Sequence, residues 1–168
     1  MRRPEPLERE RFLNEEEILV SKTDPKGRIT YGNEGFIEIS GYSEEELLGR
    51  PHSIIRHPDM PKIVFKILWD GIQQGCEVSA YVKNLAKDGS FYWVFATVTP
   101  SFDPGSGRIV GHFSVRRAPD AEKLRAIRPL YKELLDAERR GGMAASEAMV
   151  NEILATKGVD YEEFIHSL

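Results

Sequence analysis

Five short stretches of the chain are rich in apolar, β-branched and aromatic residues and are separated by polar segments. Turn sequences rich in Asp, Pro, Gly and Ser lie at 24–27, 87–90 and 103–107. Runs of this composition are typical of β-strands, and short turns of this composition join antiparallel strands. The predicted strands cover residues 18–20, 28–31, 78–85, 91–100 and 108–115.

Helix signals fill the interval between the second and third predicted strands. Asn33 can cap a short helix, and Ser43 with Glu46 forms a capping box for a second one. Asp59 is a natural N-cap for a longer helix, because its carboxylate can accept from the free N–H groups of the first turn. That helix carries an apolar stripe from Ile63 onward and is expected to end near Gly75.

Residues 119–168 have a helical pattern. Asp120 can cap a first segment, which Pro129 is expected to interrupt because proline lacks the backbone N–H that a helix interior uses. A leucine stripe then runs up to Gly141-Gly142, and further apolar positions predict helices toward the C-terminus.

Together these elements predict an α+β fold, with a five-stranded antiparallel sheet, short helices on one face, and C-terminal helices. Three units follow from the pattern: an N-terminal arm or cap helix at 1–17, a central domain at 18–118, and a helical extension at 119–168.

Composition narrows the class of protein. The net charge of −4 and the absence of a basic stripe argue against nucleic-acid binding. No apolar run is long enough for a membrane span, so cytoplasmic residence is expected, with any membrane association made through a partner. No Ser-His-Asp set, P-loop or HExxH motif is present, and we expect a binding protein rather than an enzyme.

The segment before the long helix is the first candidate site. Arg56 and His57 lie just before the predicted helix entrance, where free N–H groups favour anions. A basic pair there could hold a phosphate or pyrophosphate, since arginine offers bidentate donors to phosphate oxygens. His57 could also add pH sensitivity near neutrality.

These motifs, taken in order, resemble a PAS domain. Thr23 to Ile29 matches the family's opening hairpin, and Asn33-Glu34-Gly35-Phe36 matches the start of its first helix. Gly41 to Gly49 resembles the family's segment of "GY, then ExELxG", and Lys87-Asp88-Gly89 lies between strands as in many relatives. The resemblance spans about residues 18–117 and implies the PAS fold.

A narrower resemblance connects the chain with the flavin-binding PAS domains of bacterial aerotaxis receptors. It implies a sensor that binds FAD non-covalently and signals to a chemotaxis transducer or another signalling protein, with homodimerisation left open. Because no membrane anchor or coiled coil is visible, the chain is most similar to the stand-alone PAS partners of bipartite energy-taxis systems. Arg56, His57 and Asp59 match the positions that support FAD in the group. Trp69 matches an aromatic on the same helix, Asn33 and Asn84 match cleft-facing polar residues, and Trp93 is a further candidate for cofactor binding.

Other interpretations stay open at this point. Val78 stands where the group often has a tryptophan, which favours a PAS adaptor with an empty or differently filled cleft. His52 and His57 permit a haem-based gas sensor. Trp69 lies on the apolar stripe of its helix, and a residue in such a stripe packs in the core more often than it contacts a flavin. The C-terminal helices are expected either to cover the sheet or to bind the transducer.

Cys76 is the single cysteine of the chain. Blue-light sensors that form a flavin–cysteinyl bond carry their cysteine in the helix before the long one. Residues 49–55 contain none, so photoadduct chemistry is not expected.

Overall fold

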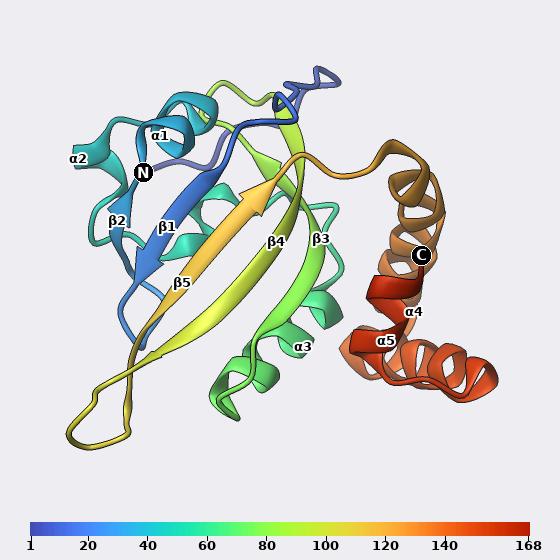
Figure 1. Ribbon diagram of the computed structural model, residues 1–168. Helices are drawn as coiled ribbons and strands as arrows, with labels where there is room; N and C mark the ends of the chain where they lie inside the picture. Colours follow the sequence, from blue (N-terminus) through green and yellow to red (C-terminus); the bar gives the residue numbers. More distant parts are fainter.

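A computed structural model describes all 168 residues and confirms the predicted α+β fold (Figure 1). Five antiparallel strands form one sheet in the order β2-β1-β5-β4-β3. The strands are β1 (Leu19–Thr23), β2 (Ile29–Gly32), β3 (Val78–Leu85), β4 (Phe91–Phe102) and β5 (Ile109–Arg117). The helices are α1 (Glu34–Ser40), α2 (Glu44–Leu47), the 3-10 helix η1 (His52–Ile55), α3 (Lys62–Gln73), α4 (Ala121–Lys157) and α5 (Tyr161–Ser167).

Local sequence explains why the short helices begin and end where they do. The Asn33 side chain accepts from the Phe36 N–H at the start of α1, and Gly41 ends that helix in the left-handed conformation with φ of 75°. Ser43 and Glu46 form the expected capping box at α2. These predictions are confirmed because each depends on partners within a few residues along the chain.

The inner face of the sheet packs against α1, α2, η1 and α3 and buries the main core, which includes Leu19, Phe36, Leu47, Ile63 and Val94. Helix α3 lies close to the sheet at Gly71. A β-carbon there would stand 2.2 Å from Cγ2 of Val78, so α3 can lie this near β3 only because residue 71 has no side chain.

The entrance of α3 differs from the prediction. The helix begins at Lys62 with Pro61 at the N-cap position and no capping side chain from its own segment. Asp59 is therefore not the cap, because it lies too far upstream of the first-turn N–H groups. Its carboxylate instead lies 3.3 Å from Nζ of Lys83 on β3.

Residues 1–17 form an extended arm and not a helix. The arm runs beside the β3–β4 turn, where Arg11 N donates to Phe91 O and Phe91 N donates to Arg9 O. Arg9 and Arg11 both pair with the carboxylate of Asp88, at 2.8 and 2.7 Å. The arm is thus held at the end of the sheet by backbone and charge contacts.

Helix α4 runs through Pro129, contrary to the predicted interruption. The lost hydrogen bond is offset by burial of Ile127, Tyr131 and Leu134 on the same stretch. The break comes at Gly141-Gly142, where Gly142 has φ of 72° and a continuous α-helix is impossible. No helix in the chain is both long enough and apolar enough to cross a bilayer.

The C-terminal helices lie beside β3 and α3, at the edge of the sheet opposite α1 and α2 (Figure 1). We call α4 and α5 the C-terminal hairpin. Two tyrosine hydroxyls bond it to the edge strand: Tyr131 donates to Tyr81 O at 2.6 Å, and Tyr161 donates to Ser79 O at 2.8 Å. The apolar seam against α3 is lined by Ile63, Val64, Ile67, Ile127, Leu130, Leu134, Val150, Ile153, Leu154, Phe164 and Ile165.

Candidate functional site

A buried arginine lies at the centre of the inner face. Arg116 on β5 is only 2% exposed and has no carboxylate partner. Its guanidinium donates to the Ser21 hydroxyl of β1 at 2.7 Å and lies 3.1 Å from Nε2 of His52. It also stacks 4.5 Å above the ring of Phe36. Ser21 and His52 are themselves 2.9 Å apart, so three side chains form one polar cluster.

The charge of this cluster is fixed at neutral pH. Burial, and next the Arg116 cation, lower the pKa of His52 to about 3, so its imidazole is neutral and accepts through Nε2. Burial lowers the pKa of Arg116 to about 10, which leaves the guanidinium charged. The inner face therefore holds one buried positive charge that no protein anion neutralises.

Several buried polar atoms on this side of the sheet lack a partner. They are the Arg116 Nε, the Tyr92 hydroxyl, the Arg56 Nε and the His112 Nε2. Burial raises the pKa of Tyr92, so its hydroxyl keeps its proton and remains a donor. Buried polar groups are nearly always hydrogen-bonded, and each exception calls for an explanation. Unpaired donors beside an unneutralised cation fit a ligand that carries several acceptors.

Three of the sequence-predicted residues meet at the entrance of α3. The Arg56 guanidinium stacks 3.8 Å above the ring of Phe65, and Arg56 forms a backbone bridge with Asn84. His57 is 3% exposed, and its Nδ1 accepts from Asp59 N at 3.0 Å. Burial, and then Lys83, lower the pKa of His57 to about 4, so it does not change charge near neutrality.

The two asparagines have different surroundings. Asn84 is buried opposite Tyr92 in the β3–β4 register, and strand alternation places it on the inner face. The Asn33 oxygen accepts from Val20 N and Phe36 N, and its nitrogen donates to Ile18 O. The amide of Asn33 thus ties α1 to β1, whereas Asn84 lies with Tyr92 among the buried polar residues of the inner face.

Neither tryptophan lies in the core of the cleft. Trp69 is 43% exposed with its ring edge-on to His112 at 5.6 Å, so the expected core packing is wrong for this residue. Trp93 faces the outer side, where its ring lies 6.0 Å from that of Tyr131 on α4. The structure places both at the margins of the predicted site.

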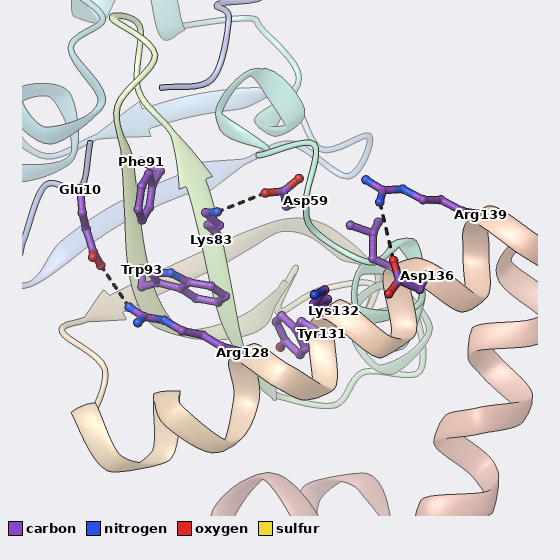
Figure 2. A pocket seen from close by; sticks show the side chains of 11 residues that line it. Glu10, Asp59, Lys83, Phe91, Trp93, Arg128, Tyr131, Lys132, Asp136 and Arg139 are labelled. Atoms are coloured by element: carbon purple, nitrogen blue, oxygen red, sulfur yellow. Dashed lines mark hydrogen bonds and ion pairs between the residues drawn. The ribbon is translucent and has the colours of Figure 1, made fainter. Parts of the chain in front are cut away.

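Trp93 and Asp59 line a different pocket, of about 460 Å³, between the outer face and α4 (Figure 2). The charged side chains around it are largely paired with one another. Lys83 lies 3.3 Å from Asp59, Arg128 3.6 Å from Glu10, and Arg139 3.7 Å from Asp136. Such mutual neutralisation distinguishes this pocket from the inner-face cluster.

The sequence predicted free N–H groups at the entrance of α3 that could bind an anion. In the structure these groups already have a partner. The Glu138 carboxylate of α4 accepts from Lys62 N at 2.8 Å and from Ile63 N at 3.1 Å. An anion does lie at this helix terminus, but it belongs to the chain itself. Phosphate support by Arg56 and His57 would have to come from their side chains alone.

Sequence reasoning missed the cluster of Arg116, His52, Ser21 and Tyr92 as a set of site residues. A signal was present, because polar residues recur at every second position of β5 at His112, Ser114 and Arg116. In a strand whose other neighbours are apolar, that period marks one polar face. Nothing in the sequence said that this face is the buried one.

Comparison with known proteins supports this assignment of the fold. A family model described as the PAS fold matches residues 29–112 of the chain. The aerotaxis receptor of Escherichia coli (strain K12) is 41% identical over 122 residues, which are 73% of this chain and 24% of the receptor. The nitrogen fixation regulatory protein of Klebsiella pneumoniae is 26% identical over 144 residues, 86% of this chain and 27% of that protein. The chain thus spans about a quarter of the length of these relatives.

Comparison with solved structures gives the same fold. The blue-light photoreceptor Aureochrome1 LOV in its dark form superposes with a TM-score of 0.55 at 28% identity, covering 73% of this chain and 84% of that one. A light-oxygen-voltage domain studied with a flavin analogue superposes with a TM-score of 0.59 at 24% identity, covering 65% and 82% of the two chains, and supports the fold alone. With the sheet order, the family match and the 41% identical relative in agreement, the chain belongs to the PAS family.

Proposed function

We propose that the chain is a redox sensor that binds FAD non-covalently in the inner-face cleft and signals to a chemotaxis transducer. The observation that carries the proposal is the buried Arg116 guanidinium, which has no carboxylate partner and whose Nε is unpaired. A buried charge without compensation is strongly unfavourable, so a ligand rich in acceptors is the simplest reason for keeping one. The 41% identity to an aerotaxis receptor, together with the motifs that resemble the flavin-binding PAS domains of such receptors, favours flavin as that ligand.

The residues present fit an isoalloxazine ring and its substituents. Arg116 and Tyr92 offer buried unpaired donors, and Asn84 offers both a donor and an acceptor. Arg56 and His57 lie next to Asn84 at the entrance of α3, where polar parts of the cofactor would be held, whereas the Asp59 carboxylate pairs with Lys83 at the outer pocket. Bound flavin supplies reversible electron transfer, and the protein residues supply orientation, a fixed positive charge and exclusion of water.

The fixed charge has a consequence for sensing. His52 and His57 are neutral at pH 7, and Tyr92 and Arg116 keep their protons, so the electrostatic field of the cleft does not vary with pH near neutrality. Such a site responds to the redox state of its ligand and not to a moderate change in pH. We propose that the protein is not an enzyme, because the cluster contains no activated nucleophile and no general base whose pKa lies near neutral pH.

The proposal extends to the partner and to the place of action. A sensor of this kind needs a second protein to receive its signal, and a chemotaxis transducer in the cytoplasm is our candidate. The signal would be a shift between two conformations that differ in their affinity for the two redox states of the cofactor.

The absorption spectrum of the protein as purified tests the cofactor. We expect the two-band spectrum of oxidised flavin, with FAD and not FMN released on heating and identified by chromatography. The apoprotein should recover the spectrum on incubation with FAD. A colourless protein that takes up no flavin would refute the proposal.

A second candidate is a PAS adaptor without a redox cofactor. It is favoured by the contact between Val78 and Gly71, which draws α3 against β3 and leaves no aromatic surface for a ring at that position. A haem sensor is less well supported, since His52 Nε2 already lies within hydrogen-bonding distance of Ser21 and Arg116. A Soret band in place of the flavin bands would favour haem.

A further inference from the structure

The start of α3 depends on a residue from the far end of the chain. Residues 58–61 supply no side-chain cap for the helix. Both oxygens of Glu138 fill this role from α4, accepting from Lys62 N at 2.8 Å and Ile63 N at 3.1 Å. A carboxylate at a helix N-terminus also interacts favourably with the helix dipole. The cap of α3 is therefore provided across a packing interface.

The C-terminal hairpin is built to hold Glu138 in this position. The Ser146 hydroxyl donates to Glu138 Oε2 at 2.7 Å, and Ser146 is fully buried. The chain can bring residue 146 back to residue 138 only because Gly142 turns it in the left-handed conformation. Glu138 therefore contacts α3 on one side and the second half of α4 on the other.

The first turn of α3 also supports residues 56–59, which we call the cofactor segment. Phe65 lies in that turn, and its ring is the platform on which the Arg56 guanidinium stacks at 3.8 Å. His57 O accepts from Met60 N, which links the segment to the helix through the backbone. A displacement of the helix start would move the surface on which Arg56 rests.

We infer that Glu138 is a positioning residue for the cofactor segment, and that it couples docking of the C-terminal hairpin to ligand retention in the cleft. The second part rests on the proposed function. Because coupling between two sites is reciprocal, ligand binding strengthens hairpin docking by the same factor by which docking strengthens ligand binding. A partner that lifts the hairpin would weaken the hold on the ligand, and ligand loss would release the hairpin.

Hydrogen exchange tests the cap without any cofactor. In Glu138→Ala we expect exchange of the Lys62 and Ile63 amides to rise about fivefold to tenfold, the range that loss of a helix cap produces. Glu138→Gln keeps one acceptor oxygen and should give a smaller rise, and Ser146→Ala the smallest. Glu133→Ala is the matched control, because Glu133 lies on the same helix, is exposed and makes no side-chain bond.

The dissociation rate of FAD tests the coupling. We expect it to rise about threefold or more in Glu138→Ala, measured well below the melting temperature of each variant, and to stay unchanged in Glu133→Ala. FAD loading should slow exchange of hairpin amides at 143–157 in the wild type but not in Glu138→Ala. This second result is one that a general loss of stability would not produce.

The outcomes separate the two proposals. A wild-type protein that binds no FAD refutes the proposed function, while the exchange of Lys62 and Ile63 still decides whether Glu138 is the cap. Unchanged exchange at these amides in Glu138→Gln and Ser146→Ala refutes the cap, even if Glu138→Ala does not fold. The coupling is refuted if Glu138→Ala raises exchange at Lys62 and Ile63 but leaves the FAD dissociation rate unchanged. It is also refuted if FAD loading speeds exchange of the hairpin amides in the wild type.

Discussion

The interface with the C-terminal hairpin and the inner face of the sheet treat their buried polar atoms differently. Across the hairpin interface, Tyr131 and Tyr161 donate to backbone oxygens of β3, and Glu138 accepts from the first N–H groups of α3. On the inner face, Arg116 and Tyr92 retain buried atoms with no partner. Both regions belong to one small fold, so the difference reflects purpose and not packing quality.

This contrast distinguishes a docking surface from a binding site. A surface that evolved to hold two parts of one chain together can satisfy every donor, because both partners are always present. A site for an exchangeable ligand must leave donors for that ligand and accept the lower stability of the protein alone. Substitutions at the interface with the C-terminal hairpin should therefore change stability, and substitutions on the inner face of the sheet should change ligand binding.

The largest effect on stability is expected from Leu134→Ala. Leu134 is 2% exposed in the seam between α4 and α3, and the truncation leaves a cavity as well as removing apolar contact. The free energy of unfolding should fall by about 2–5 kcal/mol in urea titration. At temperatures where the variant is folded, its FAD content should match the wild type. A loss of FAD in proportion to the loss of stability would contradict the distinction between the hairpin interface and the inner face.

Acid should destabilise the protein through a buried histidine at the entrance of α3. His57 has a folded pKa of about 4 and an unfolded pKa of about 6.5, so protonation favours the unfolded chain. Its contribution is complete above about pH 6.5 and is lost as the pH falls to about 4, by roughly 2–3 kcal/mol. Urea titrations across this range should show a shallower loss in His57→Gln, which does not titrate. Equal slopes in the two proteins would contradict the assignment.

Arg116→Met is the sharpest test of the inner face. Removal of an unpaired buried charge should leave the apoprotein at least as stable as the wild type in urea. FAD affinity should fall at least about tenfold, because a charge-assisted hydrogen bond contributes roughly 1.5–3 kcal/mol. Arg116→Lys keeps the charge and should fall between the two. An apoprotein strongly destabilised by the methionine would mean that Arg116 serves the fold alone.

The smallest effect is expected from Tyr131→Phe. The substitution keeps the ring in the seam but removes the hydroxyl that donates to Tyr81 O. The free energy of unfolding should fall by about 1 kcal/mol, and FAD affinity should not change. Tyr161→Phe removes the equivalent bond to Ser79 O and is the matched comparison. Calorimetry would detect both changes, and a gain in stability from either would refute the role of these hydroxyls.

Features encoded by neighbours in the sequence were predicted well. The strands, the Asn33 cap, the capping box of Ser43 and Glu46, and the left-handed Gly41 each depend on a few adjacent residues. Arg56, His57 and Asn84 were also predicted as site residues; the structure brings them together at the entrance of α3, and their role in binding stays a prediction. In these cases local chemistry and the tertiary fold agree.

Features that depend on distant partners were not predicted. Asp59 looked like the cap of α3 because Glu138, which performs that role, lies 76 residues away from Lys62. Pro129 looked like a helix break because the burial of its neighbours Ile127, Tyr131 and Leu134 could not be seen in the sequence. Arg116 looked like an ordinary charged residue, since the sequence does not say which face of β5 is covered. Each error reflects a tertiary contact that outweighs a local preference.

The contact of Gly71 with Val78 also bears on how the family has diversified. Because a β-carbon at 71 would collide with the valine, neither position can enlarge by itself while α3 keeps its place. A relative that carries a tryptophan at the position of Val78 must hold this part of α3 farther from β3. Residues 71 and 78 should thus covary across homologues, and an attempt to graft an aromatic side chain onto β3 must redesign the helix as well.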